Sequence, residues 1–135
     1  MTNPNLARDY LHRAEKRLKA VAVLLDEEAF ADVVRESQEV VELLLKAVLR
    51  TFGVAVPFSH DLSQVLTANA ERFPAAVHTL VPRWADISRS LRRDRELAFY
   101  GSEDVTPSEF YDREDAELAI AMAREVHDTA APWIR

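Results

Sequence analysis

The chain has 135 residues, a formal net charge of −6 and no cysteine. This length fits one domain with a single hydrophobic core, which we place at residues 1–135. Without cysteine, disulfides, iron–sulfur clusters and thiolate metal sites are excluded, and the composition suits a reducing cytoplasm. The sequence has neither the apolar run of a signal peptide nor the roughly 18 apolar residues of a membrane span, so we expect a soluble protein that does not contact a membrane.

Charge and composition also limit the fold and the function. A net negative charge repels polyanions on average, so any contact with nucleic acid must be local. Only 2 glycines accompany 48% apolar and 30% charged residues. This composition is typical of long amphipathic helices with few turns.

The first predicted helix runs from about Pro4 to Asp26, because apolar residues recur along it at steps of three and four. A second helix follows Glu28 and ends before Gly53, which can adopt the left-handed conformation of a helix cap. Apolar residues cover more than one face of this second helix, so we expect it to be the central one.

A narrow polar stripe follows the second helix. It comprises Arg35, Glu39, Glu42, Lys46 and Arg50. Glu42 and Lys46 stand four residues apart in the order that favours an ion pair on a helix surface. The stripe is therefore the predicted polar surface of the central helix.

Residues 54–59 are predicted to form a loop because they include Pro57, and Ser59 can cap a short third helix that continues to about Ala70. Pro74 is expected to open a fourth helix. Within that helix, Pro82 should produce a kink or a break, because proline lacks the backbone N–H that a helix interior needs.

Gly101 is expected to end the fourth helix. Residues 102–110 form the longest stretch predicted to be irregular, and Asp112 can cap a last helix with alanines along its apolar stripe. The whole pattern predicts an all-α fold, an antiparallel four-helix up-and-down bundle with one short extra helix.

Three segments of the chain resemble one protein family. The second helix carries VVRESQEVVELLLKA at 33–47, the next loop carries SHDL at 59–62, and the fourth helix ends with RELAFYG at 95–101. In this order and at these separations, they look like the second helix, the HDL turn and the arginine region of HEPN ("higher eukaryotes and prokaryotes nucleotide-binding") domains. The resemblance implies a bundle of four to five helices that usually forms a homodimer. It also implies a minimal nucleotidyltransferase as a possible partner, because such prokaryotic pairs often act as toxin and antitoxin.

Arg95 is the residue on which the predicted site depends. At 100° per residue it falls within the apolar stripe of the fourth helix, whereas Arg92 and Arg93 point elsewhere. A guanidinium aimed at an apolar seam must meet a carboxylate, backbone carbonyls, a partner subunit or an anion. Two interpretations stay open: Arg95 reaches solvent or pairs with Glu39 or Glu42, or it binds phosphate.

Catalytic HEPN proteins resemble one another in an arginine that is followed, after four to six residues, by a histidine. At those offsets from Arg95 this chain has Tyr100, Gly101 and Ser102. RNA cleavage without a metal requires a group with a pKa near 7, and a phenol, whose reference pKa is about 10, is a poor base at neutral pH. Arg72 and His78 match the spacing formally, but a proline lies between them. We therefore expect little or no ribonuclease activity.

The ligand-binding residues that we expect are Arg95, Tyr100, Arg35, Glu42, Lys46 and Arg92. No catalytic residue, metal or cofactor is predicted. The arginines of the fourth helix could steer RNA or a nucleotide to the site, or they could belong to a solvated face balanced by nearby carboxylates. His60 and Asp61 are adjacent, which favours a capping or packing role over metal binding.

These observations lead to one main hypothesis and two alternatives. The main hypothesis is a homodimer that binds a nucleotide, RNA or a nucleotidyltransferase partner with little or no catalysis. The first alternative is a metal-independent ribonuclease toxin that uses Arg95 with Tyr100 or with a histidine brought in by folding. The second is a purely structural protein–protein interaction module.

Overall fold

The computed structural model describes residues 5–135, except for the side chains of residues 93–97 and 99. Four long helices form the body of the molecule: α1 (Leu6–Asp26), α2 (Phe30–Thr51), α5 (Val81–Tyr100) and α7 (Arg113–Ile134). Shorter pieces connect them: α3 (Ser63–Ala68), the 3-10 turn η1 (Ala70–Arg72), α4 (Ala75–His78) and α6 (Pro107–Phe110). The described residues contain no strand, so the all-α prediction is confirmed.

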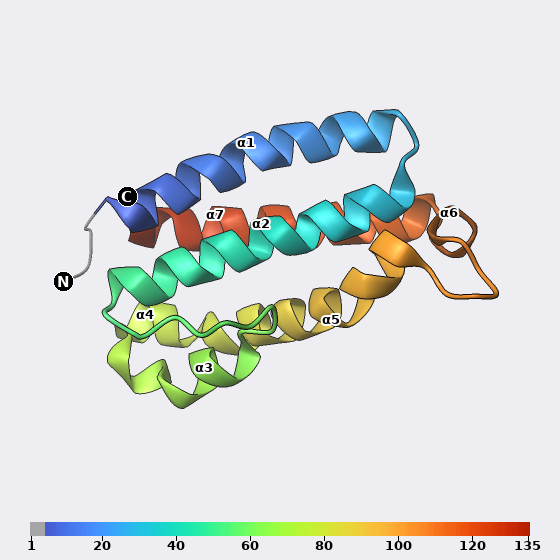
Figure 1. The fold of residues 1–135 in the computed structure, drawn as a ribbon. Coiled ribbons are helices and arrows are strands. Elements are labelled where there is room, and N and C mark those ends of the chain that lie inside the picture. The colour runs from blue at the N-terminus through green and yellow to red at the C-terminus, as the bar shows by residue number, and fades with distance from the viewer. Residues whose placement is uncertain (1–4) are drawn as a thin grey trace.

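The long helices are arranged as an up-and-down bundle, with the start of α1 and the end of α7 at the same end of the molecule (Figure 1). Helix α2 contacts each of the other three long helices. Twelve of its 22 residues are buried, which confirms the prediction that it is the central helix. No described helix combines the length and the apolarity that a membrane crossing requires.

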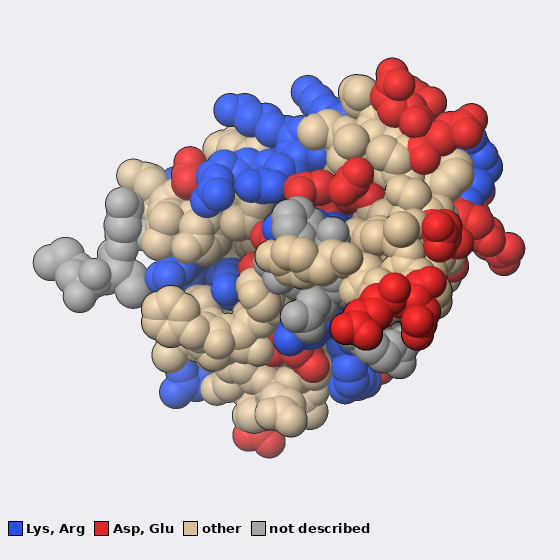
Figure 2. Space-filling model, turned by 45° about the vertical axis from the view of Figure 1, so that its right-hand side comes forward, with Lys and Arg blue, Asp and Glu red and all other residues tan. Residues whose placement is uncertain are grey.

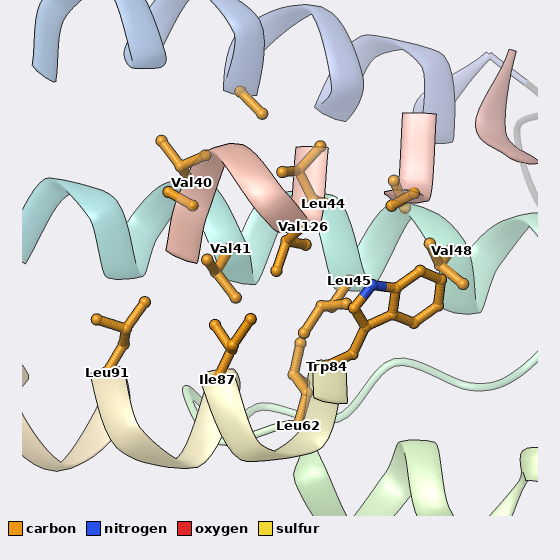
Figure 3. Packing of buried hydrophobic residues seen from close by; sticks show 14 of the residues in the cluster. Val40, Val41, Leu44, Leu45, Val48, Leu62, Trp84, Ile87, Leu91 and Val126 are labelled. Carbon is orange, nitrogen blue, oxygen red and sulfur yellow. The ribbon is translucent and has the colours of Figure 1, made fainter. Parts of the chain in front are cut away.

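The core surrounds α2 and lies between it and α1, α5 and α7. Figure 3 shows Leu45 and Val48 of α2 close to Trp84 of α5, with Val126 of α7 beside them. Trp84 is 1% exposed, and its indole Nε1 donates a hydrogen bond of 2.8 Å to Thr129 Oγ1 on α7. This bond satisfies the one polar atom of a large buried side chain.

Two glycines end helices as the sequence predicts. Gly53 follows α2 with a φ of +73°, and Gly101 follows α5 with a φ of +74°. At Gly53, the N–H of Val54 donates to the carbonyl of Leu49 over 2.8 Å, which closes the helix end. The turn between α1 and α2 has the same left-handed conformation at Glu28, with a φ of +60°, although this conformation has a steric cost for glutamate.

The third helix starts later than the sequence predicts. Ser59 Oγ accepts a bond from the N–H of Asp61 over 3.2 Å, but α3 begins only at Ser63, whose N–H donates to Asp61 Oδ1 over 2.9 Å. The delay has a tertiary cause. Leu62 is fully buried, and its N–H donates to Ser88 Oγ of α5 over 2.9 Å, so the chain is attached to the core before it can turn into a helix.

The divided fourth helix and the cap of the last helix follow the prediction. The chain forms α4 and α5 as separate pieces, with Pro82 in the first turn of α5. Asp112 and Asp115 form a capping box at the start of α7. Residues 102–110 are more ordered than expected, because Thr106 and Glu109 form a second capping box that opens the short helix α6.

A charged network fastens the end of α7 to α1. His127 Nε2 lies 2.8 Å from Glu15 Oε2, and His127 Nδ1 lies 2.9 Å from Asp128 Oδ1. Burial lowers the pKa of His127, but the bonds with the two carboxylates outweigh it, so the pKa is raised overall. The bond to His127 lowers the pKa of Glu15 against the opposing effect of burial, and Arg135, 2.8 Å away, lowers it further.

Candidate functional site

The polar stripe of α2 is more deeply covered than a helix surface usually is. Its side chains are only partly exposed: 21% for Arg35, 19% for Glu39, 11% for Glu42 and 20% for Lys46. This follows from the central place of α2, because neighbouring elements cover even its polar side. Partly buried charges need partners of opposite charge. The charges of the stripe from Arg35 to Lys46 find these partners in two clusters of side chains.

The first group, which we call the Glu36 cluster, joins α1 to α2. Glu36 Oε2 accepts a bond of 2.9 Å from Arg17 of α1, and Glu36 Oε1 accepts one of 2.7 Å from Arg35. Arg35 also lies 3.8 Å from Glu39. Two arginines therefore share two carboxylates, and this part of the stripe is electrically matched.

The second group, the Glu42 cluster, joins α2 to the loop before α3. His60 Nδ1 pairs with Glu42 Oε1, and Lys46 Nζ lies 3.9 Å from Glu42 Oε2. The amide of Gln38 donates to the backbone carbonyl of His60 over 3.4 Å and holds the loop in place. The predicted pair of Glu42 with Lys46 is present. Of the His60–Asp61 dipeptide, for which the sequence predicts a capping or packing role, Asp61 accepts a bond from the N–H of Ser63 just ahead of α3, although the N-cap position itself is Leu62 and carries no side-chain cap.

Sequence reasoning missed the contacts that Glu42 makes with His60 and that Glu36 makes with Arg17. These residues lie 18 and 19 positions apart in the chain. Helical spacing links only residues three or four apart, so no periodic pattern could reveal these pairs. The one signal in the sequence was that His60 stands two residues before Leu62, an apolar residue that the structure buries.

The two clusters are too far apart to hold one small anion. Arg35 and Lys46 are eleven residues apart on the same helix, which is about 16 Å along its axis. A single phosphate cannot bridge that distance. The stripe therefore suits either two separate contacts or one extended partner surface.

Helix α5 carries the other predicted residues. It runs antiparallel to α2, so its C-terminal half lies beside the N-terminal half of α2 (Figure 1). Leu91 and Ala98 are each 1% exposed and confirm that the predicted apolar stripe faces the core. Arg95 lies on this helix between them, but its side chain is outside the described residues, so the direction of its guanidinium stays a prediction.

Tyr100 and the other described arginines of α5 differ in their exposure and in their partners. Arg92 is partly exposed, and Tyr100 is 73% exposed at the last residue of the helix. Arg83 bonds to Glu125 of α7 over 2.7 and 3.0 Å, and Arg89 bonds to Asp86 over 2.5 Å. Part of the cationic segment is therefore neutralised by carboxylates, as expected for a solvated face.

A groove of about 390 Å³ lies on the other side of α5, against α3 and α4, and Val81, Ala85 and Arg89 line it. None of the predicted site residues whose side chains the structure describes lines it. Within the described part of the chain, no three histidine or acidic side chains are close enough together to hold a metal ion.

Comparisons with known proteins identify a family and a fold. The HEPN domain family matches residues 7–132. The crystal structure of TT1696 from Thermus thermophilus is similar, with a TM-score of 0.77 and 22% identity over 96% of this chain and 98% of that one. ST0689, an archaeal HEPN homologue, is similar with a TM-score of 0.72 and 21% identity over the whole of both chains. At these identities, the two structures show a shared fold and nothing further. No curated protein matches this chain.

Proposed function

This chain belongs to the HEPN domain family, and on that premise we propose that it acts as a homodimer that binds a ligand or partner with little or no catalysis. The ligand is a nucleotide, RNA or a minimal nucleotidyltransferase, and the setting is a prokaryotic toxin–antitoxin pair in the cytoplasm. The sequence supports the weak catalysis, because Tyr100, Gly101 and Ser102 stand where a ribonuclease histidine would follow Arg95.

The observation that carries the proposal is the charge matching along the stripe of α2 from Arg35 to Lys46. In the Glu36 cluster two arginines meet two glutamates, and in the Glu42 cluster one glutamate meets Lys46 and His60. A partner can cover such a surface without burying an unpaired charge, which would be costly. Among the three ligand classes, a protein surface fits the stripe best, and a second copy of this chain or a nucleotidyltransferase would supply it.

The experiment measures the oligomeric state by light scattering with matched variants. The monomer has a mass of 15.3 kDa, so the wild type is expected to be a dimer of twice that mass. Glu36→Lys would place a third cation beside Arg17 and Arg35 and should give a monomer. Glu125→Lys is the control, because Glu125 also accepts two bonds from an arginine but lies away from the stripe.

Two results contradict this proposal. One is a wild-type protein that stays monomeric at all concentrations, and the other is a Glu36→Lys variant that stays dimeric. Circular dichroism of each variant confirms that its helices are retained. A stable complex with a nucleotidyltransferase encoded by a neighbouring gene would extend the proposal to the toxin–antitoxin setting.

A ribonuclease is the second candidate, and the pairing of His60 with Glu42 favours it. The carboxylate holds Nδ1, while Nε2 has no hydrogen bond within the described part of the chain, and the His60 side chain is 41% exposed. A histidine oriented in this way can take a proton from a ribose hydroxyl. Cleavage of RNA in the presence of a chelator, lost in His60→Ala and in Arg95→Ala but kept in His78→Ala, would establish this function.

The third possibility is a purely structural interaction module. It predicts the same dimer, but no nucleotide should raise the melting temperature. Thermal shift measurements with mononucleotides therefore separate it from the ligand-binding proposal. A clear rise that is lost in Arg95→Ala would support a nucleotide as the ligand.

A further inference from the structure

Helix α1 presents cations on its outer face that have no acidic partner. Arg8, Arg13, Lys16 and Lys19 are all exposed, and none forms an ion pair within the described part of the chain. They lie on the half of the helix turned away from the buried Ala7, Leu11 and Ala14. By contrast, the exposed arginines Arg83, Arg89, Arg113 and Arg135 each pair with a carboxylate.

A fifth cation from α2 joins this face. The guanidinium carbon of Arg50 lies 5.6 Å from the ring centre of Tyr10, and that of Arg13 lies 6.0 Å from the same centre. The Nε of Arg50 is buried and has no hydrogen-bond partner among the described residues. Both guanidinium groups therefore lie against the same ring, which brings two positive charges to this end of α1 for an anion to bind.

Acidic residues on and around this face are few. Asp9 lies within it, and Glu15 is taken up by His127 and Arg135. On the side of α2, Glu36 is bonded to Arg17 and Arg35. The face keeps an excess of positive charge after these carboxylates are counted.

The net negative charge of the molecule is concentrated elsewhere. Residues 26–28 and 103–117 carry ten carboxylates and one arginine, whereas all other residues carry 16 Lys or Arg and 13 carboxylates. These two segments lie together, since Arg113 pairs with Glu28 over 3.4 Å. Figure 2 shows Asp and Glu gathered mainly on one side and Lys and Arg gathered over another.

Distance and screening by salt weaken the electrostatic interaction between these acidic segments and the cations of α1. Lys19, the cation of the face nearest to this end, precedes Asp26 by 7 residues, which is about 10 Å along α1, and Arg13 precedes Asp26 by 13 residues, which is about 20 Å. The screening length at physiological ionic strength is about 8 Å. The overall charge of −6 therefore does not prevent the face from attracting a polyanion.

We propose that the outer face of α1 binds single-stranded nucleic acid through its phosphodiester backbone. This face, the α1 basic face, comprises Arg8, Arg13, Lys16, Lys19 and Arg50. It extends over about 16 Å from Arg8 to Lys19, enough for several phosphates of an extended strand. The proposal is independent of the dimer proposed above, because it uses cations that the Glu36 and Glu42 clusters leave out.

The chemistry of the face favours a single strand over other polyanions. Guanidinium planes can stack on bases, and only unpaired bases are open to stacking. A membrane surface is a poorer fit, because an interfacial helix inserts several large apolar side chains and the outer face of α1 exposes only one, Val23, among its described residues.

The test is fluorescence anisotropy of labelled 12-residue single strands, one of RNA and one of DNA with the same sequence. If four phosphates are contacted, affinity should fall about 50-fold between 50 and 200 mM salt, and about sevenfold if two are contacted. The double variant Arg13→Ala/Lys16→Ala is expected to weaken binding at least tenfold at 50 mM salt. Its affinity should also fall less steeply between 50 and 200 mM salt, toward the sevenfold change expected for two phosphate contacts. Preference for RNA or DNA identifies the natural strand.

Matched controls keep the test specific. Arg72→Ala with Arg89→Ala removes the same total charge on the side of α2 opposite α1, and binding should stay within twofold of the wild type. The proposal is overturned if the wild type does not bind at 50 mM salt, or if the control variant loses as much affinity as the test variant. Stronger binding to phosphatidylserine vesicles than to either strand also overturns it. Light scattering of the test variant should still give the oligomeric state of the wild type. A failure of nucleic-acid binding can therefore be distinguished from a failure of the proposed dimer.

Discussion

Two glycines with the same backbone conformation give a stringent test of how α5 ends. Gly53 and Gly101 have φ values of +73° and +74°, but their surroundings differ. A Cβ added at Gly53 would meet no atom within 4 Å, whereas one at Gly101 would lie 2.7 Å from Pro107 Cδ and 2.8 Å from the carbonyl oxygen of Val105. Gly53→Ala thus measures backbone strain alone, and Gly101→Ala measures strain plus a steric clash.

The expected magnitudes follow from these surroundings. Alanine in the left-handed region costs about 1–2 kcal/mol, so Gly53→Ala should lower the free energy of unfolding by that amount. Gly101→Ala should cost about 1–3 kcal/mol more, because the backbone carbonyl and the proline ring cannot move aside cheaply. The segment that clashes also anchors the end of α5 beside Tyr100, so this variant should loosen the predicted site as well.

Urea unfolding followed by circular dichroism measures both variants. With a denaturant slope of about 2 kcal/mol per molar urea, Gly53→Ala should shift the midpoint by about 0.5–1 M and Gly101→Ala by clearly more. Equal shifts for the two variants would show that the close approach of residues 105–107 to Gly101 does not contribute to stability. An unchanged midpoint for Gly53→Ala would refute the assignment of a strained left-handed cap.

Three further predictions concern single side chains. Glu28→Gly should raise the free energy of unfolding by about 1 kcal/mol, because it relieves the left-handed φ of +60°, and a lower urea midpoint would contradict this. Trp84→Phe should lose about 1 kcal/mol for the hydrogen bond to Thr129 beyond the loss of ring volume, and a double-mutant cycle with Thr129→Val isolates that contribution. His127 has a raised pKa, so its contribution to stability should be full below about pH 6.5 and be lost as the pH rises through the folded pKa. The stability difference between wild type and His127→Gln should therefore shrink above neutral pH, and a difference that grows there would refute the ion pair with Glu15.

A partner on the Glu36 and Glu42 clusters and a nucleic acid on the α1 basic face would contact different charges of α1 and α2. Arg17 belongs to the Glu36 cluster, whereas Arg13 and Lys16 of the same helix carry no acidic partner in the described part of the chain. The two proposals can therefore succeed or fail separately. A dimer that also binds a single strand would present one such face on each subunit.

Much of the architecture follows from local sequence. The apolar positions of α2 cover more than one face, which determined that this helix would be central, and Gly53, Gly101 and Asp112 marked helix ends that the structure confirms. These features were accessible because they depend on residues within a few positions of one another. Caps, helical periodicity and left-handed turns are all set by near neighbours.

The candidate site depended on tertiary structure. His60 meets Glu42 and Arg17 meets Glu36 only because separate helices and a loop pack side by side, and the start of α3 moved to Ser63 because Leu62 is buried under α5. A sequence pattern records which residues share a helix face, but not which face of another element comes to lie against it. That choice is made by the packing of the whole core, in which many distant contacts are optimised at once.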